Sequence, residues 1–443
     1  MKYVLVIGDG MADNPVAELN GKTPLQYAHT PAMDALASAG TIGTVLTIPE
    51  GMQAGSDTAI LSIFGCDPRK CFSGRAPLEA AATGIRLEPG DIAYRCNLIT
   101  IEDGDMPFED KKIISHSSGA IEGDISDELI LDLFQTSPFA ESAREAGVAI
   151  YPGSSFRHIA VQSKNRISVT GDRRLEAGGQ TKGLSMPETG DDDTSEDSLR
   201  LTPPHDHINE TLGQHLPKGG RNAAVLEGLM RIAHKILDIH PINTKRRRSG
   251  KHPANGIWLW AEGTSVELPN FTGKYGKTGV VISAVPLCQG IGTLIGLKKI
   301  IVEGATGELH TNYEGKVEAA LEALKTNDFA AIHIEAPDEC THNGDLEGKL
   351  QAIKWIDSRI IAPLTDKLAG GNTDYRLMLI SDHRTLMSTR GHDGAPVPFL
   401  LYDSRVDQKM EVTYCEQDSV RGRNVASGTE LMDILFETKR PRE

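Results

Sequence analysis

Three short apolar runs, each followed within a few residues by an aspartate, constrain the fold of this chain more than any other feature. The pairs are residues 3–7 with Asp9, residues 330–334 with Asp338, and residues 377–380 with Asp382. Apolar runs of this length, with no alternating polar residues, are typical of strands buried on both faces of a parallel sheet. In open α/β sheets, ligands bind beyond the carboxyl ends of the strands. The sequence therefore predicts an α/β core with carboxylates at one edge of its sheet.

Histidines accompany two of these aspartates. Asp338 and His342 are four residues apart, so on a helical turn they share one face. His383 directly follows Asp382, and His392 comes nine residues later. A lone Asp–His pair is more often structural than functional, but three such elements within 55 residues favour a site. Carboxylates and imidazoles are the usual ligands of divalent cations of intermediate softness, such as Mn²⁺ or Zn²⁺.

Bulk composition limits the functional classes. The chain has 443 residues, enough for two or three domains, and its formal charge of −15 argues against nucleic acid or an anionic membrane as partner. A small anionic substrate would need positive charge supplied locally, and bound cations are one source. The six cysteines form no CxxC pair, and no export signal or membrane span is visible, so we expect a cytoplasmic protein with reduced thiols. Oligomeric state cannot be read from the sequence.

The sequence pattern changes between residues 90 and 255, where strand-like and helical segments are mixed with a long polar stretch. We therefore expect a core formed by residues 1–90 and 255–443, interrupted by an inserted α+β domain. Within the insert, the acidic run Asp191–Asp193 lies in a long polar stretch that reads as a solvated loop. The basic cluster Lys245–Lys251 either holds a phosphate-bearing substrate or is a plain exposed loop.

Ser56 begins a helical pattern directly after a glycine-rich stretch. Free backbone N–H groups at such a helix start suit a bound phosphate, although an ordinary N-cap serine has the same pattern. The nucleotide motifs fail. Gly276-Lys277-Thr278 lacks the P-loop glycine, because Phe271 occupies that position, and Gly290–Gly296 has Ile295 where a dinucleotide loop needs glycine. Nothing in the sequence supports a standard ATP or NAD site.

Taken in order, these motifs form a set that resembles the alkaline phosphatase superfamily and, more closely, the archaeal-type 2,3-bisphosphoglycerate-independent phosphoglycerate mutases. The set consists of Gly8-Asp9-Gly10, Gly55–Ala59, Asp338 with His342 and Gly344, Ser381-Asp382-His383, and Gly391-His392. Supporting matches are Gly74–Ala80, Arg95–Leu98, Gly304–Gly307 and Gly394–Pro398. The resemblance spans nearly the whole chain.

The resemblance implies an alkaline-phosphatase-like core and an isomerase that interconverts 3-phosphoglycerate and 2-phosphoglycerate in glycolysis. It implies two divalent cations, with Mn²⁺ as the first expectation and Mg²⁺, Zn²⁺ and Co²⁺ as alternatives. One cation would be held by Asp9, Ser56, Asp382 and His383, and the other by Asp338, His342 and His392. Ser56 would be the nucleophile and would carry a phosphoserine intermediate.

Two segments depart from the archaeal pattern, at residues 109–119 and 258–263, and resemble a bacterial sub-branch sometimes proposed to be homoserine kinases. The departures affect the residues that would read the substrate. Our expected substrate contacts are Arg75, Arg157, His158 and Arg247, the last within the basic cluster. A homoserine kinase, a metal-dependent phosphomonoesterase and a non-enzymatic binding module remain the alternatives.

Overall fold

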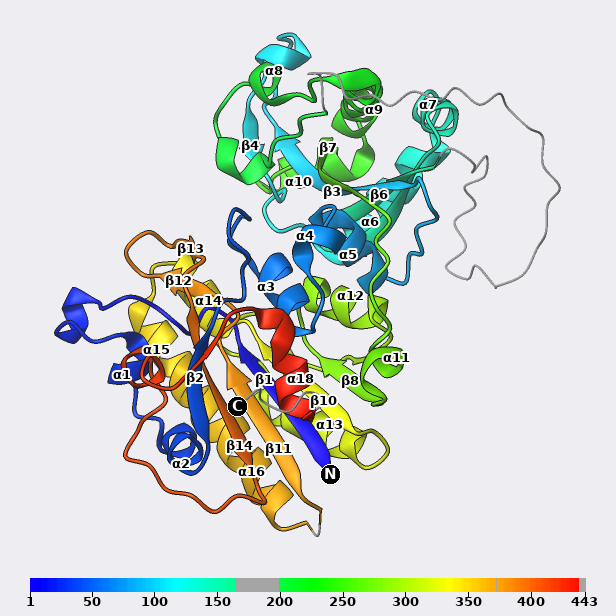
Figure 1. The fold of residues 1–443 in the computed structure, drawn as a ribbon. Helices are drawn as coiled ribbons and strands as arrows, with labels where there is room; N and C mark the ends of the chain where they lie inside the picture. The colour runs from blue at the N-terminus through cyan, green and yellow to red at the C-terminus, as the bar shows by residue number, and fades with distance from the viewer. Residues whose placement is uncertain (164–198, 372, 438–443) are drawn as a thin grey trace. The chain divides into compact units, whose positions relative to one another are not determined.

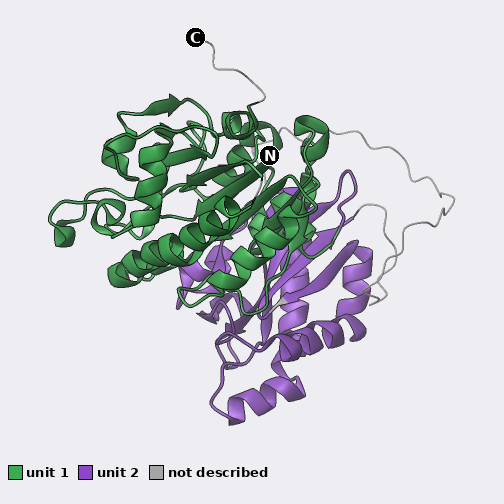
Figure 2. Ribbon diagram, turned by 90° about the horizontal axis from the view of Figure 1, so that it is seen from below, with its two compact units in different colours: residues 1–85, 266–443 green, residues 86–265 purple. Residues whose placement is uncertain are grey.

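The computed structural model describes residues 1–163, 199–371 and 373–437. The acidic run 191–193 lies outside the described residues. The chain divides into two compact units, a core unit of residues 1–85 and 266–443 and an inserted unit of residues 86–265 (Figure 2). The joins expected from sequence were at residues 90 and 255. Among the described residues, no helix combines the length and the apolarity needed to cross a bilayer.

The core unit is built on an eight-stranded sheet in the order β15-β2-β14-β11-β1-β10-β8-β9 (Figure 1). The strands are β1 (Lys2–Gly8), β2 (Thr41–Val45), β8 (Gly279–Ile282), β9 (Lys298–Ile300), β10 (Phe329–Ile334), β11 (Tyr375–Ile380), β14 (Val397–Asp403) and β15 (Arg423–Val425). Strands β11, β1, β10, β8 and β9 are mutually parallel, while β14 is antiparallel to both of its neighbours. The predicted mainly parallel sheet is confirmed.

The three apolar runs form β1, β10 and β11, which lie side by side and are almost entirely buried. Along β1, Val4 and Val6 enter one apolar cluster, whereas Leu5 and Ile7 enter another on the opposite face. Helices therefore cover both faces of the sheet, which is why these strands carry no polar alternation. In the register, Ile7 pairs with one residue on each side, in β10 and in β11, so the three strands end at one edge.

Helices and a hairpin complete the core unit. The helices near the site are α3 (Ser56–Ile63), α5 (Arg75–Ala82), α14 (Ala336–His342) and α15 (Leu346–Trp355). The others are α1 (Pro24–Tyr27), α2 (Pro31–Ala39), α4 (Pro68–Cys71), α11 (Phe271–Tyr275), α12 (Pro286–Leu294), α13 (Tyr313–Leu324), α16 (Ala362–Ala369), α17 (Glu416–Ser419) and α18 (Leu431–Phe436). A π-helical segment, Ile356–Ile361, lies between α15 and α16. Short strands β12 (Arg384–Leu386) and β13 (Gly391–Asp393) form an antiparallel hairpin after β11.

The inserted unit has its own sheet, in the order β4-β3-β6-β5, with β7 also paired to β3. Its strands are β3 (Ile92–Ile101), β4 (Ile113–Ser115), β5 (Val148–Ser154), β6 (Arg157–Gln162) and β7 (Gly256–Thr264). Its helices are η2 (Phe108–Asp110), α6 (Gly123–Gln135), α7 (Phe139–Glu145), η3 (Pro204–His207), α8 (Leu212–His215), α9 (Gly220–Asp238) and α10 (Pro241–Arg248). Strands β5 and β6 form an antiparallel hairpin. The loop expected at the basic cluster is wrong, because residues 245–248 end helix α10.

Candidate active site and metal centre

Asp9 lies directly after β1 and is fully buried at the carboxyl edge of the sheet. Its Oδ2 accepts a hydrogen bond from His333 Nε2 at 3.0 Å, and its Oδ1 lies 3.4 Å from His383 Nε2. Burial, together with the negative neighbours Asp382, Glu335 and Asp338, raises the pKa of Asp9 well above its ordinary value. A carboxylate in this position is stable in its charged form only when positive charge is brought to it.

His383 presents an unprotonated ring nitrogen to oxygen atoms. Thr385 Oγ1 donates its single proton to Asp338 Oδ1 at 2.6 Å, so this hydroxyl can only accept from His383 Nδ1, at 3.1 Å. Burial lowers the pKa of His383, which keeps the ring neutral and leaves Nε2 without a proton. That nitrogen lies 3.3 Å from Asp382 Oδ2 and 3.1 Å from Ser56 Oγ.

A second group of ligand atoms surrounds Asp338, at the start of α14. Its Oδ2 lies 3.1 Å from His342 Nε2, and its Oδ1 lies 3.3 Å from His392 Nε2. The two imidazole Nε2 atoms are themselves 3.0 Å apart. Desolvation would raise the pKa of Asp338, but the hydrogen bonds from both histidines outweigh it and hold the pKa well below its ordinary value. His342 Nδ1 donates to the carbonyl of Arg390 at 2.8 Å, which directs the other ring nitrogen at the group.

Ser56 is the first residue of α3, and the residue before it, Gly55, is the N-cap. The alternative reading of Ser56 as an ordinary capping serine is therefore wrong, because its hydroxyl contacts His383 instead of a backbone N–H group. Gly55 is also close to the second group, since a Cβ built on it would lie 3.9 Å from His392 Nδ1. The ring centroids of His383 and His392 are 4.2 Å apart, so the two groups adjoin.

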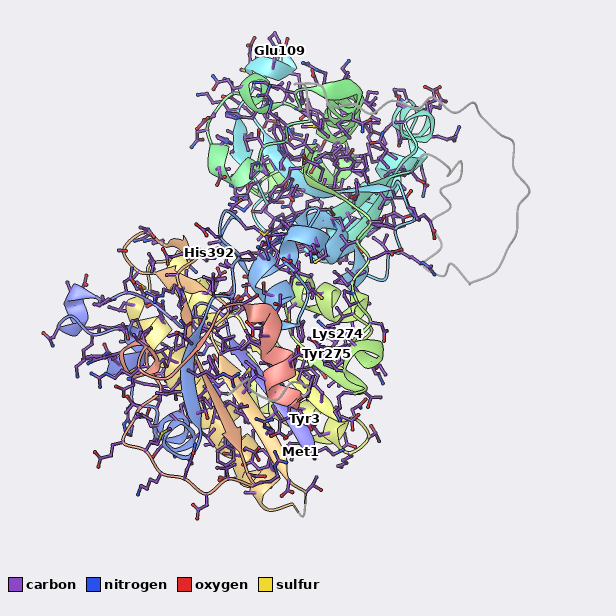
Figure 3. The ribbon with its side chains drawn as sticks, viewed as in Figure 1. Met1, Tyr3, Glu109, Lys274, Tyr275 and His392 are labelled. Atoms are coloured by element: carbon purple, nitrogen blue, oxygen red, sulfur yellow. The ribbon has the colours of Figure 1, made fainter. Side chains whose placement is uncertain are left out.

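The structure brings together all seven residues expected to bind metal. They come from five separate stretches of the core unit and are Asp9, Ser56, Asp338, His342, Asp382, His383 and His392. His392, labelled in Figure 3, belongs to the β12–β13 hairpin. Spacing alone could not show this convergence, which depends on three parallel strands ending at one edge.

These residues fit divalent cations. Asp9 Oδ1 and Asp382 Oδ2 are buried and have no hydrogen-bond partner among the described residues. Such atoms are costly unless something positive satisfies them. They lie beside His383 Nε2, another electron-pair donor, and a cation held between the three atoms would satisfy both carboxylate oxygens. Mixed carboxylate and imidazole donors suit Mn²⁺, Zn²⁺, Co²⁺ and Mg²⁺ to different degrees.

Sequence reasoning missed the residues that support the centre. His333 in β10 is buried, and burial lowers its pKa to about 3, so it holds Asp9 as a neutral donor. Its Nδ1 lies 3.1 Å from Ser283 Oγ. Glu335, directly after β10, is a partly buried carboxyl beside Asp9, and desolvation raises its pKa to about 7. The signal that could have revealed His333 and Glu335 is their position at the carboxyl end of an apolar strand.

Of the four expected substrate contacts, only Arg75 belongs to the same unit as the metal centre. It begins α5, and its Nε donates to Glu79 Oε1 at 2.7 Å. Desolvation lowers the pKa of Arg75, but the carboxylates of Glu79, Asp57 and Glu335 outweigh it and raise the pKa. Its guanidinium group, 40% exposed, therefore carries a fixed positive charge beside the centre.

The other three expected contacts lie in the inserted unit. Arg157 is exposed, and its guanidinium carbon stacks 4.3 Å from the centroid of Phe156. His158 is buried and hydrogen-bonded to Ser126 Oγ and the Gly153 N–H group, and burial lowers its pKa to about 4. Arg247 is held by Asp103 and Asp238. The substrate roles of these residues stay predictions, and the contacts of His158 and Arg247 are those of structural residues.

Comparisons with known proteins agree with the geometry. Residues 37–243 match the model of a family described as 2,3-bisphosphoglycerate-independent phosphoglycerate mutase. A protein of that name from Methanosarcina acetivorans is 41% identical over 437 residues, which cover 98% of this chain and 99% of the relative. The chain belongs to this family. A probable mutase of the same name from Geobacter sulfurreducens is 40% identical and covers 99% of the chain.

Solved structures share the fold of this chain. A protein of Pyrococcus horikoshii has a TM-score of 0.74 at 28% identity and covers 100% of the chain. A cofactor-independent phosphoglycerate mutase of Thermoplasma acidophilum has a TM-score of 0.58 at 24% identity, covers 99% of the chain, and shows the shared fold. The sequence relatives confirm the predicted membership of the mutase family, which is a family of isomerases.

Proposed function

We propose that this protein interconverts 3-phosphoglycerate and 2-phosphoglycerate by way of a phosphoserine at Ser56, without a bisphosphorylated cofactor. The observation that carries the proposal is the position of Ser56. Its hydroxyl lies 3.1 Å from His383 Nε2 at the start of α3, beside both groups of ligand atoms. The reaction is inferred from the family of mutases to which the chain belongs. The geometry provides a residue that can hold the phosphoryl group while it moves between the two glycerate hydroxyl positions.

In the proposed reaction, Ser56 Oγ attacks the phosphorus atom of the substrate's phosphate ester. The bond from Ser56 to phosphorus forms as the hydroxyl loses its proton, the ester bond breaks, and the released glycerate oxygen takes up a proton. In the second half, the neighbouring glycerate hydroxyl loses its proton and attacks the phosphoserine, and the released Ser56 Oγ takes up a proton. Backbone N–H groups in the first turn of α3, at the positive end of the helix, favour the phosphate at this position.

Asp9, Ser56, Asp382 and His383 would hold one divalent cation, and Asp338, His342 and His392 the other, with Mn²⁺ as the proposed ion. Such cations, when bound, would make the serine hydroxyl a better nucleophile and offset the charge of the phosphoryl oxygens. Arg75 is proposed to bind an anionic group of the substrate, because it is the positive side chain placed beside the centre. Arg157 is proposed as a substrate contact contributed by the inserted unit, because its guanidinium group is exposed.

The test compares the parent protein with Ser56→Ala in a coupled assay with 3-phosphoglycerate and Mn²⁺, without bisphosphoglycerate. We expect 2-phosphoglycerate from the parent and a loss of about a thousandfold or more in the variant. Ser62→Ala is the matched control, because Ser62 lies buried in the same helix and its Oγ has no hydrogen-bond partner among the described residues. Acid quenching during turnover should yield a peptide phosphorylated at Ser56.

Three parallel arms separate the alternatives. Release of inorganic phosphate from 3-phosphoglycerate, in place of the isomer, would indicate a phosphomonoesterase. Homoserine-dependent ADP release from ATP would indicate a kinase on the same core. Full mutase activity in Ser56→Ala would refute the phosphoserine pathway itself.

We also infer that the protein acts in the cytoplasm. All six cysteines are free thiols, and five of them are buried. Unpaired thiols agree with a reducing compartment.

A further inference from the structure

A second cluster of metal-ligating side chains lies in the inserted unit and contains none of the residues assigned to catalysis. His207 ends η3, His215 ends α8, and Glu210 lies between them. Glu210 Oε2 is 3.2 Å from His207 Nδ1 and 2.7 Å from His215 Nε2. One atom from each of the three residues can be chosen so that all lie within 4.8 Å of one another. The cluster offers two imidazole nitrogens and a carboxylate to one point.

The backbone that carries these side chains is fixed before any ion binds. Asn209 N donates to the carbonyl of Ile113 at 2.8 Å, and Ile113 N donates to the carbonyl of Glu210 at 3.1 Å. Leu212 N donates to the carbonyl of Lys111 at 2.8 Å. These bonds attach the segment to the chain around β4 on both sides of Glu210. A ligand set held by its backbone loses little conformational freedom on binding.

The charges of the cluster also favour a cation. The His207 and His215 rings stack with centroids 3.8 Å apart and planes 17° from parallel. Each ring turns one nitrogen toward Glu210 Oε2, so two imidazoles and one carboxylate converge on the position a cation would take. The Glu210 side chain is 48% exposed, while those of His207 and His215 are 25% and 12% exposed. An ion can therefore reach the cluster from solvent.

We propose that His207, Glu210 and His215 bind a third divalent cation, of the borderline class to which Zn²⁺, Co²⁺ and Ni²⁺ belong. Two histidines and one glutamate are a donor set that Zn²⁺ takes with a further position left to water. The ion would lie between the two rings and Glu210 and would join η3 to α8. The site is exchangeable and is separate from the two-cation centre of the core unit.

Zinc is the probe for the test. The full-length protein and a His207→Ala/His215→Ala variant are stripped with chelator, equilibrated with a small excess of Zn²⁺, desalted and measured for bound metal. The parent should hold one equivalent more than the variant, because the ligands of the catalytic centre are unchanged. His252→Ala is the control, since it removes another exposed histidine of the same unit and should leave the metal content at the parent value.

Two further measurements keep the proposal falsifiable if the double variant folds poorly. Glu210→Gln removes only the carboxylate charge and should weaken binding of the third Zn²⁺ about tenfold or more. A crystal of the parent grown with Zn²⁺ should show an anomalous peak between the three side chains. Equal metal content in parent and double variant, or a map with no peak there, would overturn the proposal. Because neither readout involves turnover, failure of the mutase assay would leave it standing.

Discussion

Thr385 links the two halves of the metal centre, and its replacement tests the ligand geometry most directly. The side chain is fully buried, and its hydroxyl donates to Asp338 Oδ1 at 2.6 Å and accepts from His383 Nδ1 at 3.1 Å. One hydroxyl therefore orients a carboxylate of the second group and fixes the tautomer of a histidine in the first. Thr385→Val keeps the shape of the side chain and removes both hydrogen bonds.

The expected magnitude follows from those two bonds. The bond to ionised Asp338 is charge-assisted, worth about 1.5–3 kcal/mol, and the bond from neutral His383 is worth about 1 kcal/mol. In Thr385→Val the His383 ring is free to protonate Nε2 instead of Nδ1, which removes its ligand lone pair. Supporting hydrogen bonds of this kind typically contribute about 10–100-fold to metal affinity. We expect the dissociation constant for Mn²⁺ to rise by about that factor at both positions.

Isothermal titration of the metal-free protein with Mn²⁺ measures this affinity without turnover. Thr385→Ser retains the hydroxyl and should bind Mn²⁺ nearly as the parent does, while circular dichroism checks that both variants fold. Parent-like affinity at both positions in Thr385→Val would refute the reasoning, because the hydroxyl would then do nothing for either group. Loss at one position only would show that Thr385 supports that group alone.

Three further variants test other parts of the structure. Burial lowers the pKa of His158 to about 4, whereas a histidine in the unfolded chain has a pKa of about 6.5. As the pH falls, the unfolded chain is therefore protonated first. The stability that is present above pH 6.5 is lost as the pH falls through 4. Chemical unfolding should show about 3 kcal/mol more acid destabilisation in the parent than in His158→Gln over that range. Lys349→Met should cost about 3–5 kcal/mol of unfolding free energy, because it leaves buried Asp13, 2.8 Å from Lys349 Nζ, without its cation; adding Asp13→Asn should recover part of the loss. Gly10→Ala should be more destabilising in thermal melts than Gly84→Ala: both glycines have positive φ, but a Cβ at Gly10 would lie 2.4 Å from Thr385 Oγ1, whereas Gly84 faces open space.

The central strands and the candidate ligand residues could be predicted from the sequence for the same reason. A strand buried on both faces has no polar positions, so the first carboxylate after it is conspicuous and marks the sheet edge. His333 escaped notice because a single histidine inside an apolar run has no pattern of its own. Its role becomes visible only in the register, which pairs it with Ile7 beside the end of β1.

The direction of β14 and the fate of the basic cluster could not be read in the same way. Strand β14 is as buried as the parallel strands of the sheet, although it runs antiparallel to both of its neighbours. Its direction depends on the connection through the β12–β13 hairpin. In the basic cluster, Arg246 donates to Ser118 O and pairs with Glu122, while Arg247 pairs with Asp103. These partners are more than a hundred residues away in sequence, so local charge density suggested a ligand site where the fold supplies acidic partners.

The two groups of ligand atoms are also coupled to each other, although their residues lie far apart in the sequence. Asp338 comes from α14 and His383 from the end of β11, yet both hydrogen-bond to one hydroxyl of the β12–β13 hairpin. Lys349 Nζ in turn donates to the carbonyl of Thr385 at 2.6 Å and is paired with buried Asp13, so the hairpin is fixed from the helix side as well. Neither ligand group can therefore shift without disturbing the other. For the proposed transfer of a phosphoryl group to Ser56 and back, a fixed spacing between the two groups is the property that the fold has to provide.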